Sequence, residues 1–193
     1  MTVAHFAASK GPMTAEELLL LPDDHVQREL VRGRVVEKMP SGGRHTRMGL
    51  RISGRIGAHA ESTGFGFATG ADGGFILGRR PDTVRCPDAA YVAHERAGGD
   101  AWTTGFYEFA PDIAVEIVSP GDRQGEIEDK VLDYLSAGSK LIWVIYPDRR
   151  MAIVWRADST VSFISEPGVL SGEDVLPALS RRWQACSRDR ELT

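Results

Sequence analysis

The clearest hydrophobic pattern in the chain lies in the decapeptide PDIAVEIVSP at 111–120. Residues 113–118 are apolar on both alternating faces, which is typical of a strand whose sheet is covered by helices on both sides. A second apolar run, at 141–146, predicts another buried strand. The segment 122–137 between them has a helical period and ends before Gly138, a favoured C-terminal cap. Two such strands joined by a helix predict a crossover with parallel pairing.

Shorter patterns on both sides of this crossover predict the remaining elements. Strands are expected at 26–31, 34–39, 89–93, 151–155 and 161–164, the last two forming a more exposed antiparallel pair. Helices are expected at 15–21, behind a capping box that begins at Thr14, and at 44–60. The segment that ends at Leu179 predicts a short helix or irregular cover. The fold class is therefore α/β, with a mixed central sheet that carries helices on its faces.

Length and composition indicate one ordinary globular domain. We expect this domain at 13–186 of the 193 residues, with flexible tails at 1–12 and 187–193. The N-terminus lacks a basic and then apolar signal layout, and no run of about 18 apolar residues occurs, so we expect a cytoplasmic protein without membrane contact. Cys86 and Cys186 have neither disulfide-framework nor zinc-finger spacing.

One residue, Glu116, breaks the apolar pattern of the strand at 113–118. Burying an ionised carboxylate costs several kcal/mol unless a cation or hydrogen bonds compensate. A buried salt bridge would explain Glu116, and so would a metal or catalytic site at the carboxyl end of the strand. Asp88 is a second candidate, because an apolar strand follows it immediately. Asp112 opens the strand of Glu116, but it lies at the opposite end, about 13 Å away.

The helix at 122–137 offers a basic partner for these acids. Its buried stripe contains Ile127, Val131, Tyr134 and Leu135, whereas Glu126, Asp129 and Asp133 point away from that stripe. Lys130 lies on the flank of the stripe. Its long side chain could extend toward the sheet and the acids at its edge. Alternatively, Lys130 pairs with Glu126 at the surface, which is the commoner arrangement for a helical lysine.

Two carboxylates and a lysine would form a set suited to phosphoester hydrolysis. Magnesium prefers hard oxygen ligands and usually takes one or two protein carboxylates, which Asp88 and Glu116 on adjacent strands would supply. Manganese is an expected substitute for magnesium. Lys130 would then stabilise developing charge or orient the attacking water.

The helix at 44–60 has a core stripe with a basic row beside it. The core stripe contains Met48, Ile52 and Ile56, joined by His45 and His59, and the basic row contains Arg44, Arg47, Arg51 and Arg55. Such a row is most often a solvated face, but beside a cleft it would suit a phosphate backbone. The net charge of -4 argues against non-specific coating of nucleic acid, yet it leaves room for a local basic groove.

Four sequence blocks, in this combination and order, carry a resemblance to a known family. They are RELVRGRVVEKMPSGGRH, VRCPDAAYV, PDIAVEIVSPGD and DKVLDYLSAGSKLIWVIYPD. Over about residues 13–155 the chain resembles the Uma-two family of the PD-(D/E)XK nuclease superfamily. The resemblance implies a restriction-endonuclease-like fold and magnesium-dependent phosphodiester cleavage, with Asp88 and Glu116 as the metal carboxylates.

The chain departs from the wider superfamily in the position of its lysine. That lysine normally follows two residues after the acidic strand residue, where this chain has Val118. The resemblance instead points to Lys130. Glu29 and His45 also match family motif positions. A structural role would explain these two equally well, since His45 lies on the apolar side of its helix.

The function expected from these features is a metal-dependent endonuclease that hydrolyses phosphodiester bonds in DNA. The alternative is a nucleic-acid-binding or assembly module that keeps the fold without cutting. A third interpretation is a metal-dependent hydrolase of small phosphoesters, which the acidic net charge would suit. Because cleavage of both strands of a duplex commonly needs two active sites, a homodimer is one expected assembly.

Overall fold

The computed structural model of the chain describes residues 11–22, 24–98 and 102–182. The expected tail at 187–193 and Cys186 lie outside the described residues, as does the tail at 1–12 except for Gly11 and Pro12. The helices are α1 (Ala15–Leu19), α2 (Gly43–Thr63), α3 (His94–Ala97) and α4 (Gln124–Ser136). None of the helices in these ranges is long and apolar enough to cross a membrane.

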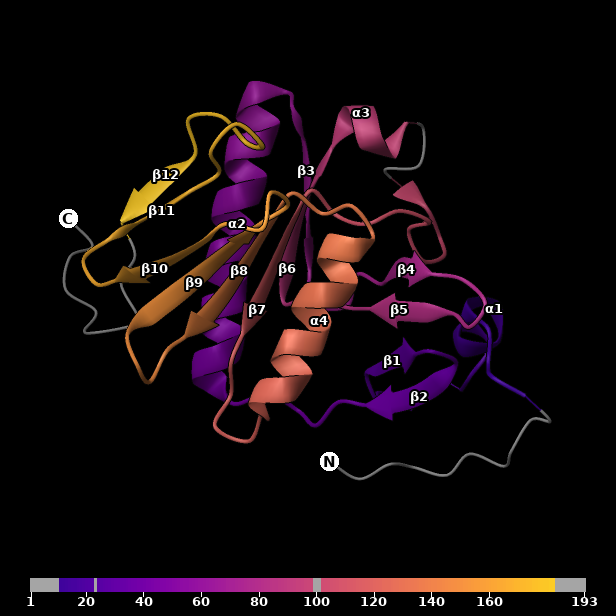
Figure 1. Cartoon of the computed structure of the whole chain (residues 1–193). Helices are drawn as coiled ribbons and strands as arrows, with labels where there is room; N and C mark the ends of the chain where they lie inside the picture. Colours follow the sequence, from indigo (N-terminus) through magenta and orange to yellow (C-terminus); the bar gives the residue numbers. More distant parts are fainter. Residues whose placement is uncertain (1–10, 23, 99–101, 183–193) are drawn as a thin grey trace.

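The central sheet has six strands in the order β10-β9-β8-β7-β6-β3. These are β10 (Val161–Ser165), β9 (Met151–Arg156), β8 (Leu141–Tyr146), β7 (Ile113–Ile117), β6 (Ala89–Ala93) and β3 (Gly66–Gly70). Among these six strands β7 and β8 pair in parallel, and the other neighbours are antiparallel. The helix α2 covers one face and α4 covers the other (Figure 1). The predicted mixed sheet and its strand-helix-strand crossover are therefore confirmed.

The strand β7 is buried on both faces, as its continuous apolar run predicts. Ile113, Val115 and Ile117 join the larger core, which also contains Met48 and Ile56 of α2. Ala114 packs in a separate core under Ile127, Val131 and Tyr134 of α4. Since side chains alternate along a strand, Glu116 falls on the α4 face. The period of the strand thus determines which helix can approach the carboxylate.

A second sheet of four strands lies beside the central one, in the order β2-β1-β5-β4 (Figure 1). Its strands are β1 (Arg28–Val31), β2 (Arg34–Glu37), β4 (Phe75–Gly78) and β5 (Thr83–Arg85). The predicted hairpin is present, and the turn has Gly33 at φ +76°, a conformation that favours glycine. The capping box of α1 is confirmed, with Thr14 and Glu17 bonded reciprocally. This small sheet brings Glu29 and Arg85 toward α4.

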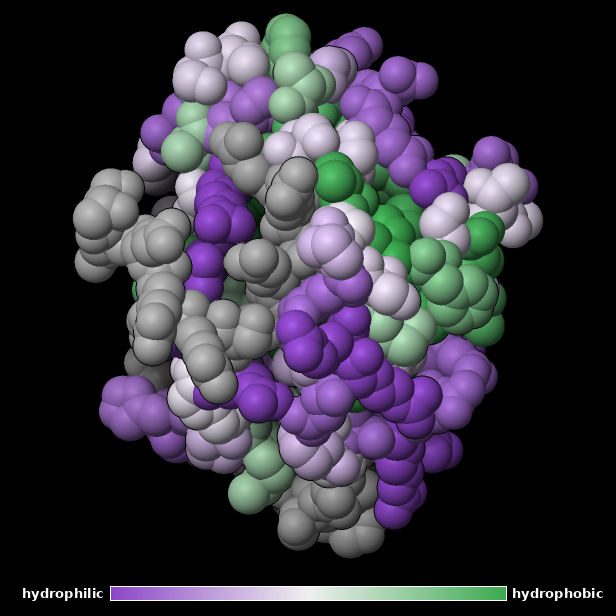
Figure 2. Space-filling model, turned by 90° about the vertical axis from the view of Figure 1, so that its left-hand side faces the viewer, coloured by the Kyte–Doolittle hydropathy of each residue, from purple (hydrophilic) through white to green (hydrophobic). Residues whose placement is uncertain are grey.

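The outer part of the central sheet is more exposed, as expected for the pair β9 and β10. The edge strand β10 presents Val161 and Phe163, the latter 71% exposed. Figure 2 looks onto this side of the molecule and shows apolar side chains gathered toward the face that carries α4.

The segment after β10 is mostly irregular, as one of the two expected alternatives has it, but it also contains a strand pairing that was not predicted. It forms a two-stranded antiparallel sheet of β11 (Val169–Ser171) and β12 (Ser180–Arg182). Gly172 allows a tight turn there, because a Cβ at this position would lie 2.4 Å from the carbonyl oxygen of Leu176. Leu170, Leu176 and Leu179 are buried in the core on the α2 side. Burial of these leucines against the sheet, which local sequence does not reveal, selects the extended pairing.

Replacement of two glycines by alanine tests how tightly β3 packs, with one glycine in β3 and the other, as a comparison, at an exposed position of α2. Gly54 lies exposed in α2, and a Cβ added at this position would meet open space, so Gly54→Ala should stabilise the protein by about 0.5–1 kcal/mol through helix propensity. At Gly66 a Cβ would lie 2.1 Å from the carbonyl oxygen of Val92. Gly66→Ala should therefore lower the urea midpoint of unfolding. An unchanged or raised midpoint for Gly66→Ala would contradict this account of the β3–β6 contact.

Candidate active site

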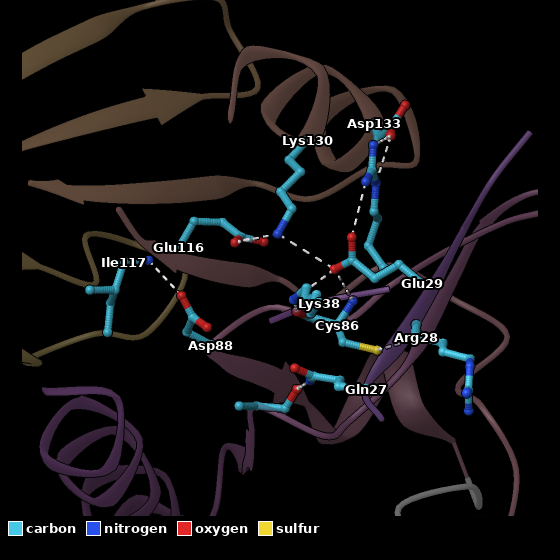
Figure 3. A network of polar contacts seen from close by, with 12 residues as sticks. Gln27, Arg28, Glu29, Lys38, Cys86, Asp88, Glu116, Ile117, Lys130 and Asp133 are labelled. Carbon is cyan, nitrogen blue, oxygen red and sulfur yellow. Dashed lines mark hydrogen bonds and ion pairs between the residues drawn. The ribbon is translucent and has the colours of Figure 1, made fainter. Parts of the chain in front are cut away.

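Asp88 and Glu116 lie at neighbouring positions across the antiparallel strands β6 and β7. Ala89 opposes Val115, and the amide of Asp88 donates to the carbonyl of Val115 at 2.9 Å. Oδ2 of Asp88 accepts a hydrogen bond from the amide of Ile117 at 2.7 Å. Both carboxylates are largely buried, with 11% of the Asp88 side chain and 3% of the Glu116 side chain exposed. The structure thus brings the two predicted acids together at one end of the strand pair (Figure 3).

Lys130 reaches from α4 to Glu116 (Figure 3). Its Nζ lies 2.8 Å from Oε2 of Glu116, and the hydroxyl of Tyr134 donates to Oε1 at 2.8 Å. Ile127, Val131 and Tyr134 pack against the sheet, so the flank position of Lys130 places its ammonium at the carboxylate. Of the two expected arrangements, the inward one is correct, because Lys130 is largely buried and pairs with Glu116 rather than at the surface.

The surroundings of these groups shift their pKa values. Burial raises the pKa of Glu116 above its ordinary range, which Lys130 and Lys38 oppose. Burial also disfavours charge on Lys130, but the carboxylates of Glu116 and Glu29 outweigh it and raise the pKa of the ammonium. For Asp88, the cost of burial is outweighed by the hydrogen bond with His45, which lowers the pKa of the carboxyl. Glu116 therefore depends on a neighbouring cation to keep its charge.

Glu29 lies at the centre of a buried network between the hairpin and α4. Its Oε1 is 2.8 Å from Nζ of Lys38 and 3.5 Å from Nζ of Lys130, and its Oε2 is 3.0 Å from Arg85. The amide of Cys86 donates to the same Oε1 at 3.1 Å. Burial of Glu29 is more than offset by these cations, and the pKa of its carboxyl is lowered. The structure therefore joins Glu29 to Glu116 through Lys130.

The position of Asp133 on its helix suggests a side chain that points away from the protein interior. In the structure this side chain instead points toward the second sheet. It accepts hydrogen bonds from Nε and a terminal nitrogen of Arg85 at 2.9 and 2.7 Å. The reason is that the second sheet covers this flank of α4, which the helical period of α4 alone does not show. Cys86 beside this network is buried and has a free thiol, and burial raises the pKa of that thiol to about 12.

His45 lies in the first turn of α2 and contacts Asp88 directly. Its Nε2 is 3.2 Å from Oδ2 of Asp88, and the side chain is 15% exposed. The histidine is thus largely buried and in contact with Asp88. Its two expected roles, structural and catalytic, are compatible with this one position.

The arginine row of α2 is exposed along its length. Arg44, Arg47, Arg51 and Arg55 are all exposed. Arg44 forms an ion pair with Asp148, in the turn between β8 and β9. The row runs over three turns of a helix that covers the face opposite to Glu116, so only its beginning lies near Asp88. Binding of a phosphate backbone along this row remains a prediction.

Three residues of the site were missed by sequence reasoning: Lys38, Arg85 and Tyr134. Arg85 could have been predicted as Glu116 was, because it too is a charged residue within an apolar segment, the one around β5 and β6. Tyr134 fits the buried stripe of α4, but the stripe does not disclose a hydrogen bond to Glu116. Lys38 follows an ordinary hairpin strand, and nothing in its local sequence indicates that its side chain pairs with a buried carboxylate.

The donor set can be compared with the needs of a magnesium ion. Among residues 11–22, 24–98 and 102–182, no group of three or more His, Cys, Asp or Glu side chains is arranged to hold a metal. Magnesium needs only one or two carboxylates, because it keeps waters and binds substrate phosphate. A carboxylate has about four lone-pair sites. The donors include the Ile117 amide on Asp88, and Lys130 and Tyr134 on Glu116, and they occupy only part of these sites. Asp88 and Glu116 therefore keep acceptor positions of the kind that magnesium uses, and binding of the ion between them remains a prediction.

Comparisons with known proteins agree with this architecture. A crystal structure titled as "a putative nuclease belonging to DUF820" from Anabaena variabilis matches with a TM-score of 0.78 and 22% identity, over 89% of this chain and 95% of that chain. This likeness shows a shared restriction-endonuclease-like fold. No curated protein matches the chain. The model of the Uma2 family, described as "Putative restriction endonuclease", matches residues 15–185. The chain therefore belongs to the Uma2 family.

Proposed function

We propose that this protein is a magnesium-dependent endonuclease that hydrolyses phosphodiester bonds in DNA. The observation that carries the proposal is the ion pair of Lys130 with Glu116, at 2.8 Å and beside Asp88. Membership of the Uma2 family supports nuclease activity. Two acids and one amine in this arrangement are suited to a reaction that must neutralise charge on phosphate.

The residues of the site have separable roles in such a reaction. When bound by Asp88 and Glu116, a magnesium ion supplies Lewis-acid stabilisation of the phosphate charge. Lys130 has three N–H donors, so it can hold Glu116 and also donate to a phosphate oxygen or orient the attacking water. Tyr134 fixes the other oxygen of Glu116, and the amide of Ile117 fixes Asp88. The protein thus presents its charged groups already oriented.

Removal of divalent metal should abolish cleavage. Supercoiled plasmid incubated with EDTA-treated protein should stay intact, and addition of magnesium or manganese should restore nicking. An Asp88→Asn protein purified identically is the control, because nicking in that sample would reveal a contaminating nuclease. Plasmid binding without cleavage under either metal would contradict the proposal and favour the non-cleaving binding module.

A further inference from the structure

Two lysines from different elements approach one oxygen of Glu29. Lys38 directly follows β2, and its amide donates to the carbonyl of Gln27 at 2.9 Å, which holds its backbone to the hairpin. Its Nζ lies 2.8 Å from Oε1 of Glu29 and donates to the carbonyl of Cys86 at 2.6 Å. Nζ of Lys130 lies 3.5 Å from the same Oε1. Lys38 is thus the closer cation to this oxygen (Figure 3).

The partners of Glu29 differ in how far they can move. Arg85 is held on its other side by Asp133, and the Cys86 amide belongs to the backbone. Lys130, by contrast, is a long side chain on the flank of α4 and lies between two carboxylates. A buried carboxylate that loses a cation attracts the nearest one that can move. Without Lys38, that cation is Lys130.

We propose that Lys38 is a positioning residue that satisfies Glu29 and thereby keeps the ammonium of Lys130 on Glu116. This inference rests on the proposed function, because it gives Lys130 its place in the reaction. The charge of Lys38 also acts on both acids of the site, since it lowers the pKa of Asp88 and opposes the rise in the pKa of Glu116. Lys38 therefore acts on the site without being required to touch the substrate.

A crystal structure of full-length Lys38→Met provides the direct test. We expect Nζ of Lys130 within hydrogen-bond distance of Oε1 of Glu29 and no longer bonded to Glu116. Lys38→Gln, which keeps a donor for the Cys86 carbonyl but has no charge, should show the same shift if the methionine variant does not fold. Lys130 remaining at 2.8 Å from Glu116 in these variants would overturn the proposal.

Kinetics then separate positioning from a merely structural role. The single-turnover cleavage rate of Lys38→Met should fall by about 10- to 100-fold, because a small displacement of a catalytic group has effects of that size. The affinity for the same DNA duplex, measured in calcium, should fall much less than the cleavage rate, because Lys38 makes no proposed contact with phosphate and the shift of Lys130 affects at most one such contact. Lys38→Arg should recover part of the rate by keeping the charge.

Lys140→Met is the matched control. Lys140 pairs with buried Asp112 at the other end of β7, 3.1 Å away, so its loss removes another, more exposed lysine from a buried carboxylate without affecting Lys130. Its cleavage rate should equal that of the wild type. A wild-type rate in Lys38→Met despite a displaced Lys130 would overturn the positioning role. If the wild-type protein cleaves nothing, the proposed function fails, whereas the position of Lys130 in the variant structure still decides what Lys38 does.

Discussion

Glu116→Gln is expected to lower the magnesium-dependent cleavage rate by about 10²- to 10³-fold, the range measured for single groups that stabilise transition-state charge. Glutamine keeps the shape of the side chain and an acceptor for the Tyr134 hydroxyl, but it loses the negative charge. The variant therefore removes both a carboxylate for magnesium and the counter-charge of Lys130. Single-turnover cleavage of an end-labelled duplex at saturating enzyme measures the effect.

The control for this variant is Asp129→Asn, which removes an exposed carboxylate from the outer side of α4. It should cleave at the wild-type rate. Thermal unfolding of both variants checks that Glu116→Gln remains folded, as expected because Glu29 lies close enough to keep Lys130 paired. Wild-type cleavage by a folded Glu116→Gln would be incompatible with the proposed mechanism.

Arg85→Met should destabilise the protein by about 3–5 kcal/mol, because it removes one partner from a buried charge network. Arg85 is 7% exposed in its side chain and bridges Glu29 to Asp133. Methionine fills similar space but leaves Asp133 without this partner and Glu29 with one cation fewer. Urea unfolding followed by circular dichroism measures the free energy of unfolding.

Arg44→Met is the comparison for this stability effect. Its ion pair with Asp148 is exposed on both sides, so its loss should change the free energy of unfolding by less than about 1 kcal/mol. Equal effects of the two substitutions would show that the Arg85 network does not hold the second sheet to α4.

The agreement between sequence and structure is best where the signal is local. The apolar run of β7, the helical period of α4 and the capping box at Thr14 each predict their element, and the observed bounds differ by a few residues at most. The short pair β11–β12 was not predicted, because Leu170 of β11 and the leucines of the connecting turns pack into a core formed by distant elements of the chain. Local patterns report periodicity, whereas this pairing depends on contacts across the fold.

For the candidate site, too, local sequence predicted some features and only the tertiary structure decided the others. The sequence alone determined that Asp88 immediately precedes one strand segment and that Glu116 interrupts another, where a charge within an apolar strand requires a partner. Only the tertiary structure decided that this partner is Lys130, because a lysine on a helix flank can turn toward solvent or toward the sheet. It also decided that Lys38 and Arg85 pair with Glu29 and that Asp133 pairs with Arg85, because the second sheet is packed against α4 by residues far apart in the chain. Periodicity shows on which face of its own helix or strand a side chain lies, whereas packing between elements decides which residues that side chain contacts.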